Sequence, residues 1–283
     1  MSHLILQSPS LTAGHIEQIA AIVSASGVQE LGPTAVRLLE ADASEKEAVA
    51  AHCDNYRIDF AFLPQIDLLR ERRILAMDMD STLISIECID EIADAVGRKP
   101  QVAAITEAAM RGEIKDFSES LRRRVALLEG VPESALMEVY EQRLRLNPGA
   151  ERLVSVAQQH GLKILLVSGG FTFFTEKLKA RLGLDVCHAN VLEVAQGKLT
   201  GRVLGDIVDA KGKAAHLAKL AEELGATPDQ IIAVGDGAND LDMMALARYS
   251  VAYRAKPVVR EQAAFALNFS PLDAIVNWFR LSH

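Results

Sequence analysis

The sequence predicts an α/β fold: a doubly wound parallel sheet with an inserted helical cap, and in front of it a small ferredoxin-like α+β domain. Three observations support this prediction. Beyond residue 70, apolar runs that read as strands alternate with helical patterns, which is typical of a parallel sheet covered by helices. Roughly eighty residues of helical periodicity separate Thr82 from Leu162, far more than a crossover connection needs. Residues 1–70 follow a different order, strand-helix-strand-strand-helix-strand.

Residues 1–70 are expected to form the first domain. Their apolar patterns predict strands over 3–7, 28–31, 35–39 and 58–62, and helices over 12–26 and 44–55. Gly32-Pro33 separates the two middle strands, because glycine permits a turn and proline cannot donate to a continuing ladder. The order is that of a ferredoxin-like sandwich, and it resembles the ACT-type regulatory domains, which often bind amino acids.

Residues 71–283 are expected to form the second domain, around the parallel sheet. Short apolar runs predict its strands over 74–77, 162–167, 231–234 and 250–253. The first three of these strands run directly into polar clusters. Ligands of doubly wound sheets bind beyond the carboxyl ends of the strands, so these clusters are the candidate site.

The excess residues after Thr82 are expected to form a helical cap, inserted at about 87–145 and able to cover the strand ends. Helical patterns within it cover 87–96, 100–111, 116–128 and 133–143. A second irregularity lies at 191–203, where Gln196-Gly197-Lys198 predicts the turn of a hairpin.

The charge of the chain argues against a nucleic-acid partner. The 38 acidic side chains outnumber the 30 basic ones, which gives a formal net charge of −8, whereas a surface that binds nucleic-acid phosphates needs an excess of basic groups.

No run approaches the roughly 18 apolar residues of a membrane span, and residues 1–10 lack the basic region of a secretory signal. Cys53, Cys88 and Cys187 include no CxxC pair, which fits a reducing compartment. We expect a cytoplasmic protein with neither a nucleic-acid nor a membrane partner.

Carboxylates follow two of the predicted strands. Asp78 and Asp80 come directly after strand 74–77, and Asp236 and Asp240 come after strand 231–234. Four carboxylates at one sheet edge repel each other unless a cation lies among them. Hard oxygen ligands without histidine or cysteine favour Mg²⁺, so a magnesium site is expected there.

Two further segments suit an anion, although each is common in other settings. Ser168-Gly169-Gly170 precedes a helix expected to start near Phe171, where backbone N–H groups and a hydroxyl can hold an anion. Taken alone, this sequence is an ordinary turn. Lys211 is likewise usually a solvated lysine, but a phosphate site needs one such cation.

These residues, in this order along the chain, resemble the four motifs of haloacid dehalogenase-type phosphatases. The motifs read Asp78-x-Asp80-x-Thr82, Ser168, Lys211 and Gly235-Asp236-Gly237-x-Asn239-Asp240. The closer resemblance is to the phosphoserine phosphatase family, through Glu87, Met110-Arg-Gly and the segment 117–124. The resemblance covers residues 74 to about 270.

The resemblance implies roles for the core residues. Asp78 is the expected nucleophile, which takes the phosphoryl group as an aspartyl-phosphate, and Asp80 is the expected acid and base. Ser168, Gly169 and Lys211 are expected to hold the phosphoryl oxygens. The Mg²⁺ ligands are expected to be Asp78, the carbonyl of Asp80, Asp236 and Asp240.

The resemblance also implies how the cap recognises its substrate. Glu87 and Arg124 would match the ammonium and carboxylate groups of phosphoserine. Phe117 lies two helical turns before Arg124, so an apolar wall and a guanidinium share one face. Met110 and Asn239 are expected to contact the substrate as well.

The activity implied is the Mg²⁺-dependent hydrolysis of O-phospho-L-serine to serine and phosphate, the last step of serine biosynthesis. An alternative is a related phosphatase or phosphotransferase acting on another small phosphate such as phosphohomoserine, because Glu87 and Arg124 discriminate poorly between amino acids. A catalytically idle amino-acid sensor is disfavoured by the presence of both Asp78 and Asp80. Serine binding by residues 1–70 and assembly into a homo-oligomer are further partner hypotheses.

Overall fold

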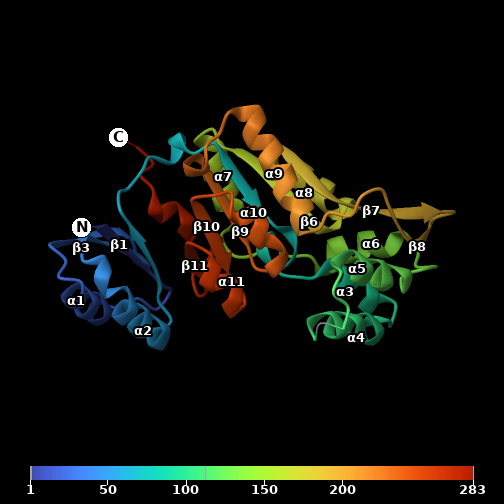
Figure 1. The fold of residues 1–283 in the computed structure, drawn as a ribbon, viewed down its shortest axis with the longest axis horizontal. Coiled ribbons are helices and arrows are strands. Elements are labelled where there is room, and N and C mark those ends of the chain that lie inside the picture. Colours follow the sequence, from blue (N-terminus) through green and yellow to red (C-terminus); the bar gives the residue numbers. More distant parts are fainter. Residues whose placement is uncertain (1, 112, 283) are drawn as a thin grey trace.

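The computed structural model describes residues 2–111 and 113–282, with Met110 described by its backbone alone. The chain forms two sheets joined by a linker (Figure 1). The first sheet contains β1 (Ser2–Gln7), β2 (Gly27–Gly32), β3 (Ala35–Ala41) and β4 (Asp59–Leu63). Its order is β2-β3-β1-β4 and all its pairs are antiparallel, which confirms the predicted α+β architecture.

Two helices cover one face of this sheet. They are α1 (Ala13–Ile22) and α2 (Lys46–Tyr56), and they bury a cluster that includes Leu4, Leu6, Ile19 and Leu38. Helix α1 begins where the Thr12 hydroxyl accepts a hydrogen bond from the backbone N–H of His15, at 3.3 Å. It ends four residues earlier than predicted, because Ser24 adopts a positive φ of 49° that turns the chain toward β2.

The second sheet has seven strands in the order β11-β10-β9-β5-β6-β7-β8. The strands are β5 (Ile74–Met77), β6 (Lys163–Phe171), β7 (Val186–Ala195), β8 (Lys198–Leu204), β9 (Ile231–Gly235), β10 (Tyr249–Tyr253) and β11 (Phe265–Leu267). All neighbours are parallel except the β7–β8 hairpin. The predicted doubly wound sheet is therefore confirmed.

Helices cover both faces of the second sheet. They are α7 (Ala150–Gln159), α8 (Thr172–Leu182), α9 (Ala210–Leu224), α10 (Leu241–Met244) and α11 (Pro257–Gln262). Leu75 and Met77 of β5 pack with α7 and α8, whereas Ile74 and Ala76 pack with α9 and α10. Alternate residues of one strand thus face opposite layers, which explains why β5 reads as an uninterrupted apolar run.

The predicted insert is helical. It contains α3 (Cys88–Ala95), α4 (Lys99–Met110), α5 (Phe117–Ala126) and α6 (Ser134–Glu138), which coincide with the four expected runs. The β7–β8 hairpin pairs with the loop after α5: Gly130 donates to the carbonyl of Leu199, and Leu199 donates to that of Val131, both at 2.8 Å. The hairpin and the insert are therefore in direct contact.

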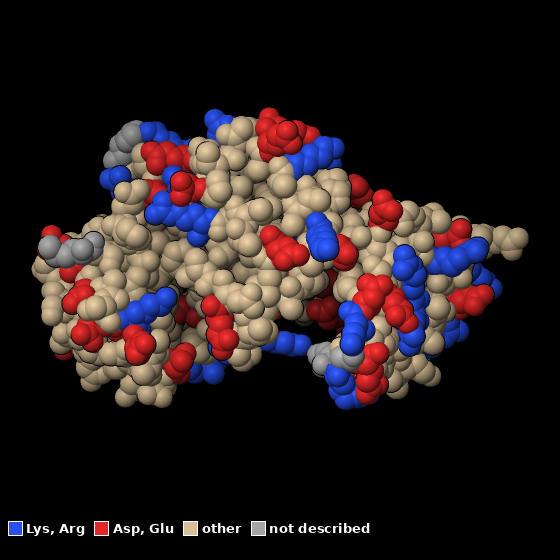
Figure 2. Space-filling model, viewed as in Figure 1, with Lys and Arg blue, Asp and Glu red and all other residues tan. Residues whose placement is uncertain are grey.

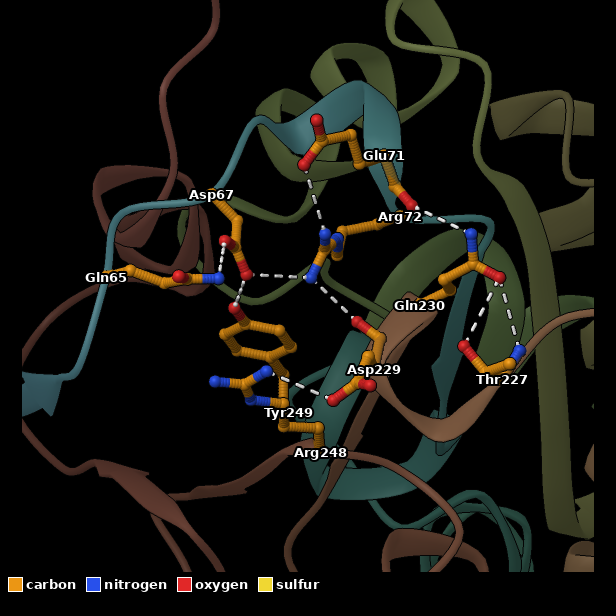
Figure 3. Close-up of polar contacts among 9 residues, drawn as sticks. All are labelled: Gln65, Asp67, Glu71, Arg72, Thr227, Asp229, Gln230, Arg248 and Tyr249. Atoms are coloured by element: carbon orange, nitrogen blue, oxygen red, sulfur yellow. Dashed lines mark hydrogen bonds and ion pairs between the residues drawn. The ribbon is translucent and has the colours of Figure 1, made fainter.

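The linker between the sheets is held by a buried carboxylate. Asp67 accepts hydrogen bonds from Arg72 Nη1 at 3.0 Å, from the Tyr249 hydroxyl at 2.7 Å and from Gln65 Nε2 at 2.7 Å (Figure 3). Arg72 also donates to the carbonyl of Asp229 at 2.7 Å. Because Asp229 and Tyr249 lie at the amino ends of β9 and β10, the linker is fixed to the sheet edge opposite the candidate site.

A second carboxylate joins the first sheet to the C-terminal segment. Asp59, at the start of β4, accepts hydrogen bonds from three backbone N–H groups, those of Asn268 (2.7 Å), Phe269 (3.0 Å) and Ser270 (2.7 Å).

Among residues 2–111 and 113–282, no helix has the length and apolar character that a membrane crossing requires.

Candidate active site

A cavity of about 680 Å³ lies between the carboxyl ends of the central strands and the helical insert. Figure 2 shows the hollow between the body of the molecule and the insert, with acidic side chains inside it. The predicted site residues that line it are Asp78, Asp80, Glu87, Phe117, Arg124, Ser168, Gly169, Asp236 and Asn239. The structure thus brings together residues spread over more than half of the chain.

Three carboxylates converge at this end of the cavity: Asp78 and Asp236 line it, and Asp240 is fully buried beside them. Asp78 directly follows β5, and Asp236 and Asp240 follow β9. One carboxylate oxygen of each lies within 4.8 Å of the others. Burial raises the pKa of Asp78 well above its usual value, and the charge of Asp240 raises it further. Burial, followed by Asp240, raises the pKa of Asp236 to about 7.

The lysine of this site is Lys213. Its Nζ donates to Asp78 Oδ1 and to Asp240 Oδ1, both at 2.7 Å, and its side chain is 0% exposed. Burial by itself lowers the pKa of Lys213, but the two carboxylates outweigh it and the net shift is upward. Lys213 is therefore held as a cation between two carboxyl groups.

The prediction of Lys211 as the phosphate-holding lysine is wrong. Lys211 is exposed and lies outside the cavity lining. Residues two apart on a helix point about 200° away from each other, so only one of the two lysines of α9 can face the sheet. The side chain of Asp209 caps α9 by accepting from the N–H of Gly212 at 2.8 Å, and this fixes which face Lys213 occupies.

Asp80 lies beside the carboxylate cluster but outside it. It follows β5 in a tight turn, Met79–Leu83, in which Ser81 has a positive φ of 57°. Asp80 Oδ1 accepts from the N–H of Cys88 at 3.4 Å. Burial, followed by the charge of Glu87, raises the pKa of Asp80 to about 8. Asp80 thus retains a proton at neutral pH.

Two polar side chains support that turn. The hydroxyl of Thr82 donates to Asp236 Oδ1 at 2.8 Å. Asn147 Nδ2 donates to the carbonyls of Thr82 (2.8 Å) and Ile84 (3.0 Å). Nothing in the sequence around Asn147 indicates this role.

Ser168 and Gly169 lie where strand β6 reaches the cavity. The strand continues to Phe171, so Ser168-Gly169-Gly170 is extended rather than a turn, and α8 begins at Thr172. The Ser168 hydroxyl accepts from the N–H of Gly170 at 2.8 Å. A Cβ at Gly170 would lie 2.9 Å from Met79 Cε and 3.0 Å from Asp80 Oδ2, so a side chain there would force Met79 and the Asp80 carboxyl group to shift.

Asn190 is a buried supporting residue that the sequence reading missed. Its Nδ2 donates to the carbonyl of Gly169, and its Oδ1 accepts from the N–H of Val208, both at 2.8 Å. Asn190 thereby connects β7 to the segment that precedes α9.

The insert supplies the opposite wall of the cavity. Glu87 accepts from the Ser81 hydroxyl at 2.6 Å, and burial raises its pKa. Burial lowers the pKa of Arg124, while nearby carboxylates, Glu87 among them, oppose that change. The ring of Phe117 lies close to Gly169 of β6, since a Cβ at Gly169 would lie 3.0 Å from Phe117 Cζ. The predicted contact of Met110 lies outside the described side chains.

The donor set fits a hard metal ion. Asp78, Asp236 and Asp240 offer only carboxylate oxygens, the ligand type that Mg²⁺ prefers. Asp80 contributes no carboxylate to this set, and its expected contribution is a backbone carbonyl.

Comparisons with known proteins agree with this geometry. Residues 75–245 match the haloacid dehalogenase-like hydrolase family, and residues 4–49 match a domain of unknown function. A protein from Polaromonas sp. (strain JS666) named phosphoserine phosphatase is 58% identical over 212 residues, which are 74% of this chain and 90% of that protein.

Two solved structures extend the similarity over nearly the whole chain. A haloacid dehalogenase-family hydrolase from Salmonella enterica serovar Typhi has a TM-score of 0.89 at 30% identity, covering 99% of this chain and 98% of the other. A probable phosphoserine phosphatase from Vibrio cholerae, in unliganded form, has a TM-score of 0.84 at 38% identity, covering 98% and 85%. The chain therefore belongs to the phosphoserine phosphatase family of the haloacid dehalogenase superfamily.

Proposed function

We propose that the protein hydrolyses phosphoserine to serine and inorganic phosphate through an aspartyl-phosphate at Asp78. The observation that carries this proposal is the position of Asp78, which lines a cavity whose opposite wall presents Glu87 and Arg124 and which is paired with Lys213, buried behind the lining. The Lys213 ammonium opposes the rise in the pKa of Asp78 and so favours its ionised, nucleophilic form, which suits attack on phosphorus. A carboxylate and a guanidinium suit the two charged groups of the seryl end.

In the first step, a carboxylate oxygen of Asp78 attacks phosphorus and the bond from phosphorus to the seryl oxygen breaks. Asp80 donates its proton to the departing oxygen. Its pKa of about 8 keeps the acid form populated at neutral pH, as this step requires.

In the second step, Asp80, now ionised, takes a proton from a water molecule that attacks the phosphorus of the aspartyl-phosphate. The acyl–phosphate bond breaks, phosphate leaves and the Asp78 carboxylate is restored. Lys213 and the Ser168 segment, whose position Asn190 holds, would stabilise the charge on the phosphoryl oxygens.

Asp78, Asp236 and Asp240 would hold Mg²⁺, together with the carbonyl of Asp80. The ion supplies positive charge that offsets the repulsion between the nucleophile and the phosphate. The carboxylate-only donor set supports this assignment.

The seryl ammonium and carboxylate would pair with Glu87 and Arg124, while Phe117 closes the apolar side of the cavity. Asn239 lines the cavity from the segment after β9 and would contact the same ligand. The same cavity leaves room for a longer ligand, so phosphohomoserine belongs in any substrate test.

The test is Mg²⁺-dependent phosphate release from L-phosphoserine, compared with phosphothreonine, phosphohomoserine and sugar phosphates by kcat/KM. A clear preference for phosphoserine is the expected result. Equal values for all four would remove Glu87 and Arg124 from substrate recognition. Asp78→Asn should abolish both turnover and the trapped aspartyl-phosphate, and substantial residual activity would contradict covalent catalysis at Asp78.

Several finer hypotheses stay predictions. They are the division of the chain into domains 1–70 and 71–283, the likeness of the first to ACT domains, its binding of serine, and assembly into a homo-oligomer. Cys53, Cys88 and Cys187 are free thiols, which supports the reducing cytoplasm as the compartment that we propose.

A further inference from the structure

The first sheet contains a buried arginine that has no acidic partner among residues 2–111 and 113–282. Arg37, in the middle of β3, is 7% exposed. Its Nη1 donates to Gln29 Oε1 at 3.1 Å, and its Nε is buried without a hydrogen-bond partner. Within the described part of the chain, Arg37 forms no ion pair with a carboxylate. Buried arginines are ordinarily paired, because an isolated charge is costly to remove from water.

A second basic side chain, His3, lies near Arg37. Arg37 pairs with Ile5 of β1, which places His3 on the same face of the sheet, away from α1 and α2. His3 Nδ1 is also buried without a partner. Burial, then the charge of Arg37, lowers the pKa of His3, and Glu40 opposes both.

A second arginine approaches from the C-terminal segment. Burial and then the charge of Arg280 lower the pKa of Arg37. The backbone of Arg280 is fixed beside the linker, since its N–H donates to the carbonyl of Asp67 at 2.8 Å and its carbonyl accepts from Leu69 at 2.9 Å. The side chain of Arg280 is exposed, so this end of the group opens to solvent.

The like charges of Arg37 and Arg280 repel each other, and such repulsion grows where water is excluded. An anion between them removes the repulsion and satisfies the unused N–H donors. The planar fork of a guanidinium matches two oxygens on one centre, which favours an oxyanion over a halide.

We propose that Arg37, His3 and Arg280 form a binding site for a small oxyanion, a carboxylate or phosphate group, at the junction of the first sheet and the C-terminal segment. The site is separate from the cavity at Asp78. It joins the two parts of the chain, because Arg37 and His3 lie on the first sheet and Arg280 follows the last turn of the second domain.

The test measures an NMR signal of the Arg37 side chain itself. The full-length protein is labelled with ¹⁵N-arginine, and the Nε–Hε signal of Arg37 is identified as the one lost in Arg37→Met. Inorganic phosphate, acetate and chloride are titrated separately at constant ionic strength, so that screening is the same in every arm. The expected result is a saturable movement of this signal with phosphate, acetate or both, and none with chloride. Which of the two oxyanions binds more tightly identifies the chemical class of the natural ligand.

Arg280→Gln separates this site from the phosphate site of the cavity. The variant should weaken the response of Arg37 by about tenfold or more, while product inhibition of turnover by phosphate stays unchanged. Arg181→Gln, which removes an exposed arginine from α8, is the matched control and should leave both unchanged. The proposal is overturned if neither oxyanion moves the Arg37 signal, if chloride moves it as strongly, or if Arg280→Gln leaves the response intact.

Discussion

Removal of the Lys213 ammonium tests the electrostatics of the active site most directly. Lys213→Met keeps the volume of the side chain but leaves Asp78 and Asp240 buried without their cation. Lys213 makes two charge-assisted hydrogen bonds of 2.7 Å with no exposure to solvent. A hydrogen bond to a charged group contributes roughly 1.5–3 kcal/mol, and removing one partner of a buried ion pair costs about 3–5 kcal/mol. We expect the free energy of unfolding to fall by about 4 kcal/mol near pH 8 without metal.

The assay is urea denaturation in the presence of a chelator. The pKa values of Asp78 and Asp236 are higher in the folded protein than in the unfolded chain. Between about pH 4 and these raised values the folded protein therefore binds more protons, and its free energy of unfolding increases as the pH falls. Because burial holds the pKa of Asp78 well above its usual value, lowering the pH protonates this unpaired carboxylate, and the cost of Lys213→Met should shrink toward pH 5. Lys211→Met, on the exposed face of the same helix, should change stability by less than about 0.5 kcal/mol. Equal effects of the two substitutions, or a cost independent of pH, would refute this reasoning.

Three further substitutions probe the insert and the junction of the two sheets. Arg124→Ala should lower kcat/KM for phosphoserine by about 100-fold more than for p-nitrophenyl phosphate, which has no carboxylate, and equal losses would exclude a contact with the substrate carboxylate. Glu87→Gln should shift the basic limb of the kcat/KM profile for an alkyl phosphate without an ammonium group, such as glycerol phosphate, to lower pH, because the charge of Glu87 adds to burial in raising the pKa of Asp80. An unmoved limb would assign that limb to another group. Asp59→Asn should lower the free energy of unfolding in urea by about 2 kcal/mol, because an amide cannot accept hydrogen bonds from all three N–H groups. The kcat for phosphoserine should stay the same, and an unchanged stability would mean that water replaces the lost hydrogen bonds.

The sequence was sufficient for elements with a strong local pattern. Strand β5 was predicted with its observed ends, because four apolar residues stop abruptly at Asp78. Strand β11 was missed, since three residues of mixed burial carry no pattern and are placed by pairing with β10. The first half of β7 was missed as well, because its residues are only partly buried at the side of the sheet.

Site residues were predicted where reactive side chains directly follow a predicted strand. They were missed where only packing determines which side chain faces the site. The choice between Lys211 and Lys213 depends on which face of α9 meets the sheet. Leu217 and Leu220, four and seven residues after Lys213, are buried on that face, so the helical period alone favoured Lys213. No comparable signal marked Asn190, because its partners are backbone groups distant in sequence.

The pairing of the β7–β8 hairpin with the loop after α5 has a consequence for chimaeras of this fold. Three backbone hydrogen bonds join the two segments, two of them at Leu199 and one from Glu133 to the carbonyl of Gly197. Gly201, at a φ of 81°, lies so close to the insert that a Cβ would be 3.1 Å from Glu129 Cβ. If an insert is transplanted from a relative and the relative's hairpin is left behind, the loop of that insert must pair with the β7–β8 hairpin of this chain, to which it is not matched. The unit to exchange when engineering a new specificity is the insert together with residues 186–204.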